Sequence, residues 1–189
     1  FSGLFEPDPD AIYQRASHAF RNQNDQEAKR QVERLLEFPS HQVSAAMLGA
    51  EIALKSGDFK EVIRYYDYVP DDASRESLKA RRRSGDLYLF ELKQLSPAEN
   101  EFQRAIKSFP DDLKVLQRLS FIYGLTSRGW QAVPFRLKLL QQEKIDAILV
   151  YLLAMGDRSL ENPQLLIEYG QKNPEDPLVQ LGKARLEWD

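Results

Sequence analysis

The sequence predicts an all-α fold built from antiparallel helix pairs that stack on one another. Apolar residues recur at helical spacing through most of the 189 residues, and prolines or short polar turns separate the runs. Small residues on these helices also return every 34 to 36 positions. A single helix pair cannot bury its apolar face alone, so several copies must stack to form a core.

Composition is that of an ordinary globular protein, with 42% hydrophobic and 29% charged residues. A net charge of −3 argues against a nucleic-acid partner, because the chain has no excess of cations to replace phosphate counterions. The absence of cysteine excludes disulfides and thiolate chemistry, and it is compatible with a cytoplasmic or an extracytoplasmic location. The longest apolar run, 147–154, is too short to insert into a membrane as a spanning helix.

We expect residues 1–8 to be irregular and residues 9–189 to form a single helical-repeat domain. The chain starts at Phe1 without a methionine and stops at Asp189 inside a helical pattern, so we interpret it as a fragment or processed form. The expected helix pairs, followed by a terminal helix, are 9–39, 41–70, 74–110, 112–142, 144–173 and 176–189.

The stretch 96–112 is the best-formed example of a second helix. Ser96 is placed to cap the helix, and Glu99 follows at the capping-box spacing. Phe109 and Pro110 end the helix. The acidic pairs Asp111-Asp112 and Asp71-Asp72 stand at expected helix starts, where capping explains them without catalysis.

The other pairs follow the same plan. Gly57 suits the left-handed end of a first helix, and Asp58 begins the next with a capping box. We expect Pro134 in the first turn of its helix, where its missing N–H does little harm. The fifth pair is looser, with a strongly apolar helix over 145–155.

Two sets of small residues test the repeat. The second helices carry Ala28, Val62, Ala98 and Ala132, with steps of 34, 36 and 34 residues. The first helices carry Ala16, Ala50, Gly85 and Ser120, with steps of 34, 35 and 35 residues. Antiparallel helices pack closely where small side chains meet, so both sets belong at helix crossings.

Gly85 with Tyr88 matches a G-x2-Y element, and Leu119-Ser120 with Tyr123 matches L-G-x2-Y with serine for glycine. With the period, these motifs resemble the tetratricopeptide repeat, over about residues 9–142 well and 143–189 weakly. The resemblance implies a right-handed α-solenoid of about five repeats plus a terminal helix. The leading tryptophan of that repeat is replaced by Ile12, Ala46, Arg81 and Leu116.

Catalytic and metal-binding patterns are missing from the sequence. His18 and His41 lie far apart without a partner at metal-ligand spacing, so we interpret both as solvated surface residues. Nucleophile-elbow, phosphate-loop, zinc-helix and dinucleotide motifs do not occur. The sequence therefore predicts a protein that is not an enzyme and holds no cofactor or metal.

The run Arg81-Arg82-Arg83 is the strongest basic cluster and points in three directions around a helix. One interpretation is a solvated face. The other is that one or two of these arginines reach an inner groove and pair with an acidic peptide or a terminal carboxylate.

The family resemblance implies that first helices line a concave, peptide-binding groove. The candidate groove residues are Tyr13, Phe20, Met47, Arg82, Phe90, Lys114, Arg118 and Phe121. Lys114 and Arg118, one turn apart, partly resemble the basic residues of the family's carboxylate clamp, but Met47 and Glu51 at the matching earlier places argue against that clamp. For each aromatic residue, packing in the core explains the pattern equally well.

We therefore predict a protein-interaction scaffold that holds a peptide or helix of an unidentified protein partner in its groove. One alternative is an assembly module that self-associates through residues 145–154 or the terminal helix. Another is an accessory domain of a longer protein that is an enzyme or is anchored in a membrane.

Overall fold

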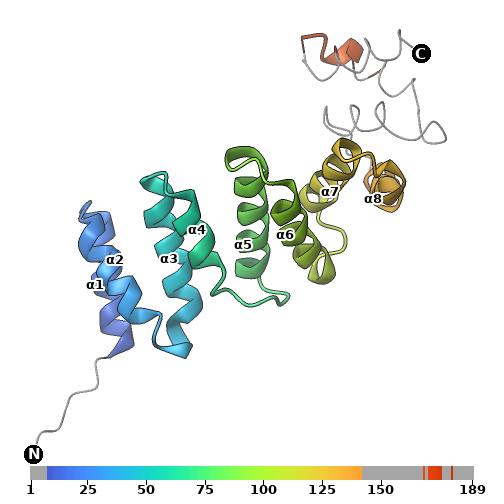
Figure 1. The fold of residues 1–189 in the computed structure, drawn as a ribbon. Coiled ribbons are helices and arrows are strands. Elements are labelled where there is room, and N and C mark those ends of the chain that lie inside the picture. Colours follow the sequence, from blue (N-terminus) through green and yellow to red (C-terminus); the bar gives the residue numbers. More distant parts are fainter. Residues whose placement is uncertain (1–7, 142–167, 169, 176–179, 181–189) are drawn as a thin grey trace, which may run out of the picture. The chain divides into compact units, whose positions relative to one another are not determined.

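The computed structural model describes residues 8–141, 168, 170–175 and 180, and these form only helices and turns (Figure 1). The chain divides into two compact units, with the boundary between Glu101 and Phe102. Each unit is described by itself. The expected segment 1–8, the fifth pair and the terminal helix lie almost entirely outside the described residues. No described helix is both long and apolar enough to cross a membrane.

The first unit contains three helix pairs in chain order (Figure 1). Helix α1 packs against α2 and α3 against α4, while α2 contacts α3 and α4 contacts α5, so successive pairs stack. The prediction of an all-α fold of stacked helix pairs is confirmed. The elements are α1 (Pro9–Arg21), α2 (Asp25–Leu35), η1 (Pro39–His41), α3 (Gln42–Lys55), α4 (Phe59–Tyr66), α5 (Arg75–Asp86), η2 (Leu87–Glu91) and α6 (Leu95–Ser108), whose last residues belong to the second unit.

Side-chain caps begin most of these helices. The carboxylate of Asp58 accepts a hydrogen bond from the Glu61 N–H at 3.1 Å, as the sequence predicts. Helix α5 is capped by Ser74 rather than by the acidic pair before it, because the Asp72 carboxylate is used to accept the Ser74 N–H. Helix α6 begins one residue before the expected cap at Ser96.

The small residues found by their period are buried at the helix crossings, as predicted. In the second pair the packing is closest at Gly49, where an added Cβ atom would lie 2.5 Å from the Tyr65 ring. All eight period markers are buried: Ala16, Ala50, Gly85, Ser120, Ala28, Val62, Ala98 and Ala132.

A left-handed residue ends each described first helix. It stands seven residues after the small marker in three pairs but eight residues after Gly85 in the third. The extra residue is absorbed by η2, a π-helical turn in which the Leu92 N–H donates to the Leu87 carbonyl, five residues back. The left-handed residues are Gln23, Gly57, Lys93 and Ser127.

Two charge networks join neighbouring pairs in the first unit. The outer charge network consists of Glu33, Arg64, Glu61 and Lys29, on α2 and α4. Arg64 lies 2.5 Å from Glu33 and 2.7 Å from Glu61, and Lys29 lies 2.8 Å from Glu61. The Arg64 hydrogen bond is the main cause that lowers the pKa of Glu61 to about 2, with a further contribution from Lys29.

The inner charge network is centred on Arg81, whose side chain is 1% exposed. Its guanidinium donates to the Glu101 carboxylate at 2.9 Å and to the carbonyls of Tyr66 and Val69 at 2.6 and 2.7 Å. Its Nε lies 3.1 Å from the Asp71 carboxylate. Arg81 thus satisfies carbonyls at the end of α4 and links α4, α5 and α6.

The second unit contains the end of α6 together with α7 (Leu113–Leu125) and α8 (Gly129–Gln141). Asp112 caps α7 by accepting the Val115 N–H at 3.0 Å, as predicted. Pro134 lies in the second turn of α8 rather than the first, because the helix already begins at Gly129. It has no N–H to donate to the Trp130 carbonyl, four residues earlier.

Candidate functional site

The three consecutive arginines of α5 have different environments. Arg81 is fully buried, so the interpretation of a solvated face is wrong for this residue. It occupies the leading position of the repeat, where Ile12, Ala46 and Leu116 are also fully buried. Arg82 is half-buried, and Arg83 is exposed.

The interpretation of both histidines as solvated residues needs one correction. His18 is exposed, as expected. His41 is half-buried and lies between the Asp10 carboxylate and the Ser40 hydroxyl, each 2.9 Å from a ring nitrogen. The reason is that the first two pairs bring Asp10, 31 positions away in sequence, against the start of α3. Among the described residues, no cluster of acidic or histidine side chains could hold a metal ion.

The expected groove residues of the first unit lie on α1, α3, α5 and η2. Tyr13, Phe20 and Met47 are half-buried and pack against the core of this unit. The Lys55 ammonium lies 5.7 Å from the centre of the Phe20 ring. In the second unit, the predicted groove residues Lys114, Arg118 and Phe121 lie on α7 and are half-buried.

Phe90 is 40% exposed and lines a hollow in the first unit with Leu54, which is 39% exposed. We call this the α3–α5 hollow. Its volume is about 240 Å³. Its lining residues are Leu54, Phe59, Val62, Tyr66, Arg83, Asp86, Leu87, Phe90 and Glu91.

The α3–α5 hollow combines an apolar lining with a charged rim. Burial is the main cause that raises the pKa of the Tyr66 phenol, while nearby Arg83 partly opposes this effect. Because three charged side chains share the rim with six apolar or aromatic residues, the hollow can take an apolar group and contact polar groups beside it.

The size of this hollow limits what it can hold. Pockets for small molecules and cofactors usually measure about 300–1,000 Å³. The hollow is therefore better matched to one large side chain of a partner than to a cofactor.

Repeat position explains why Leu54 and Phe90 share the hollow. Phe20, Leu54 and Phe90 each stand three residues before the left-handed turn residue of their pair. The π turn preserves this position in the third pair despite the extra residue. Of the residues that line this hollow, Phe90 was predicted from the sequence as a groove residue. Arg82 was predicted in place of Arg83, and Leu87 and Glu91 were not among the candidates.

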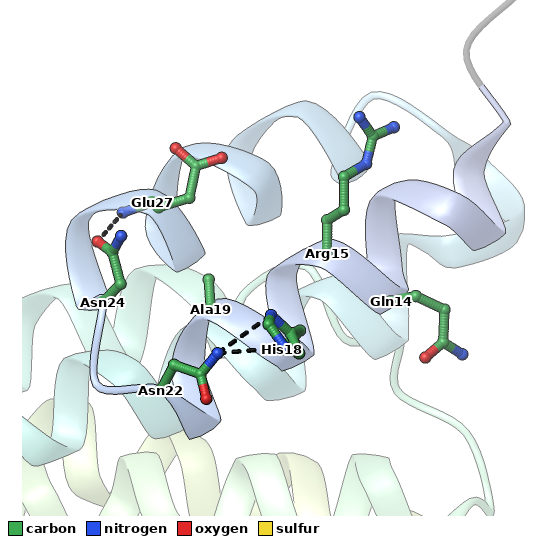
Figure 2. A pocket seen from close by; sticks show the side chains of 7 residues that line it. All are labelled: Gln14, Arg15, His18, Ala19, Asn22, Asn24 and Glu27. Carbon is green, nitrogen blue, oxygen red and sulfur yellow. Dashed lines mark hydrogen bonds between the residues drawn. The ribbon is translucent and has the colours of Figure 1, made fainter.

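A second hollow of about 580 Å³ lies between α1 and α2, and all but one of its lining residues have polar or charged side chains (Figure 2). Several of its side chains already form hydrogen bonds within α1, α2 and the turn between them. The Asn24 carbonyl oxygen accepts the Glu27 N–H at 3.2 Å, and the Asn22 amide lies 3.2 Å from both ring nitrogens of His18. Hydrogen bonds from Gln31 and then Arg30 lower the pKa of Glu27. The α3–α5 hollow is therefore the stronger candidate.

No protein-family model matches the sequence, and no curated protein matches it. Solved structures do match. A tetratricopeptide repeat protein from Parabacteroides merdae superposes with a TM-score of 0.70 at 13% identity, covering 95% of this chain and 72% of that chain. YrrB, described as a TPR protein with an unusual peptide-binding site, gives 0.71 at 14% identity, with 94% and 92% coverage. MamA gives 0.60 at 14% identity, with 95% and 90% coverage.

The chain has the tetratricopeptide-repeat fold. At these identities the likeness concerns the fold alone, so the use of the α3–α5 hollow has to be argued from its own residues. The best-supported site of this chain lies near the ends of the first helices, beside the turns that connect each pair.

Proposed function

We propose that this tetratricopeptide-repeat chain is a protein-interaction scaffold whose α3–α5 hollow receives an apolar side chain of a partner peptide or helix. The observation that carries the proposal is the pair of exposed apolar residues, Leu54 and Phe90, in one hollow of side-chain size. A solved structure of the same fold, YrrB, is described as having a peptide-binding site, which supports this class of function.

The chemistry of the hollow suits an anchoring contact. Peptide recognition commonly depends on a few apolar or aromatic side chains that enter pockets, while neighbouring contacts exclude water. Phe90 offers an aromatic face and Leu54 an aliphatic one, and their partial exposure leaves apolar area for a partner to cover.

A displayed library of random peptides, selected on the full chain, tests this proposal. We expect the selected peptides to carry a large apolar residue. Their binding should fall at least about tenfold in Phe90→Ser or Leu54→Ser, in line with the loss of an interface anchor. Trp130→Ser is the matched control, because Trp130 is 68% exposed on α8 and lies outside the hollow. Equal binding to all three variants would contradict the proposal.

The expectations of no enzymatic activity, no cofactor and no nucleic-acid partner stay predictions. Self-association also stays a prediction, because the segments expected to mediate it lie outside the described residues.

A further inference from the structure

The rim of the α3–α5 hollow carries two uncompensated charges of opposite sign. Arg83 and Glu91 both line the hollow, and neither forms an ion pair or a side-chain hydrogen bond within the described part of the chain. The other charges nearby are already engaged: Asp86 interacts with another residue, and Glu51 pairs with Lys79 at 3.3 Å.

The separation of these two charges matches a short peptide segment. Arg83 and Glu91 are eight positions apart on one continuous helical stretch, α5 followed by η2. At 1.5 Å per residue this corresponds to about 12 Å, and the wider π turn shortens it slightly. An extended peptide advances ~3.3 Å per residue, so this axial distance between the two backbone positions corresponds to about three to four residues of a bound strand.

We propose that the hollow recognises a peptide segment in which one large apolar residue lies between a carboxylate and a basic side chain. The inference rests on the proposed function and deepens it. The carboxylate pairs with Arg83, the basic side chain pairs with Glu91, and the apolar residue enters between them against Leu54 and Phe90.

Charge complementarity favours this mixed segment over segments of a single sign. A wholly acidic segment would bring a carboxylate close to Glu91 and Asp86, and a wholly basic one would bring a cation close to Arg83. Juxtaposed like charges at an interface are unfavourable and select against the wrong partner.

The test selects random twelve-residue peptides, displayed on phage, against the full chain and reads the flanks of the apolar anchor. We expect enrichment of peptides with opposite charges three or four positions apart, one on each side of that anchor. An apolar anchor without this charge pattern would overturn the inference and leave the proposed function standing. Failure to enrich any peptide, or peptides that bind Phe90→Ser as well as the native chain, would overturn both.

Synthetic copies of the most enriched peptide then assign each charge. Arg83→Gln should weaken binding by up to about fivefold, the size expected for an exposed ion pair. The loss should vanish when the peptide carboxylate is replaced by an amide. Glu91→Gln should likewise weaken binding, and that loss should vanish when the basic side chain of the peptide is replaced by a neutral one.

Arg75→Gln and Glu76→Gln are matched controls, because both residues are exposed on α5 and neither lines the hollow. If Arg83→Gln weakened the amide peptide as much as the acidic one, the assigned pairing would be wrong. Equal helicity of all four variants, measured by circular dichroism, would show that they are folded.

Discussion

The first and second helix pairs are joined differently from the second and third. At the first joint, Tyr65 of α4 donates its hydroxyl to Glu33 of α2, and the outer charge network joins the same two helices. The Arg64 and Glu33 side chains are 38% and 43% exposed. At the second joint, the inner charge network is buried, with Arg81 and Glu101 at 1% and 7%.

The same repeat architecture therefore accommodates an arginine either buried between two pairs or partly exposed at their edge. The two placements differ in the solvation free energy that the guanidinium loses on folding. A guanidinium taken from water loses several kcal/mol of solvation, which only a full set of acceptors can offset. At the second joint these acceptors are two carbonyls and the Glu101 carboxylate, and the Asp71 carboxylate adds an ion pair 3.1 Å from Nε. At the first joint, the Arg64 and Glu33 side chains stay partly in water, so the solvation cost is smaller.

The largest expected effect comes from Arg81→Ala. It removes the buried donor to Glu101 and to the carbonyls of Tyr66 and Val69, so we expect the free energy of unfolding to fall by about 3–5 kcal/mol. Urea denaturation followed by circular dichroism measures the change.

Two controls sharpen this result. Arg83→Ala removes the exposed neighbour and should change stability by less than about 0.5 kcal/mol. Replacing Arg81 and Glu101 together by methionine should recover part of the loss, since no buried carboxylate is then left unpaired. A double variant less stable than Arg81→Ala would show that the buried pair does not set the cost.

Gly49→Ala tests the packing inside the second pair, against the Tyr65 ring whose hydroxyl contributes to the first joint. The new methyl group would overlap the Tyr65 ring, and we expect a loss of about 1–3 kcal/mol from overpacking. Gly129→Ala is the matched control on α8, because an added Cβ there meets nothing within 4 Å. It should leave stability unchanged or raise it by up to about 1 kcal/mol. A Gly49→Ala chain as stable as the native one would mean that Tyr65 can move aside.

Arg64→Ala tests the outer charge network and should have a smaller effect. Because this network is partly exposed, we expect a loss of no more than about 1 kcal/mol, which added salt reduces further. Denaturation at low and high salt measures this. A loss as large as that of Arg81→Ala would remove the distinction between the two joints.

Acid tests the outer charge network through the Glu61 carboxyl group. The folded-state pKa of Glu61 is about 2, lowered from an ordinary 4.5 chiefly by Arg64. A lowered carboxyl pKa stabilises the fold above pH 4.5, and this contribution is lost as pH falls from 4.5 toward 2. Glu61→Gln should therefore flatten the stability profile across this window in acid titrations of unfolding. An unchanged slope would show that other carboxyl groups dominate.

The number and spacing of the helix pairs over residues 9–142 were predictable, because close helix packing requires small residues at regular intervals in the sequence. Small residues such as Ala16 and Ala98 recur wherever two helices cross, and the structure buries them there. The position of Arg81 was also predictable, since it replaces the leading aromatic residue. Its role was not, because its acceptors include backbone carbonyls, which have no signature in the sequence.

The candidate site was less predictable for a related reason. The two marker steps differ in the third pair, and the spacing from Gly85 to Ala98 is one residue longer than elsewhere. That spacing signals an insertion but does not say whether the turn or the helix absorbs it. The helix does so through η2, and the rim of the hollow is formed by Arg83 and Glu91.

The buried guanidinium of Arg81 has a consequence for how such a chain can be rearranged by duplication or by engineering. Its carbonyl acceptors belong to the preceding pair, at Tyr66 and Val69. A copy of the third pair placed after the first would separate the Arg81 guanidinium from these two carbonyls. The second and third pairs therefore have to be duplicated or transplanted together, although the repeats of this fold otherwise look interchangeable.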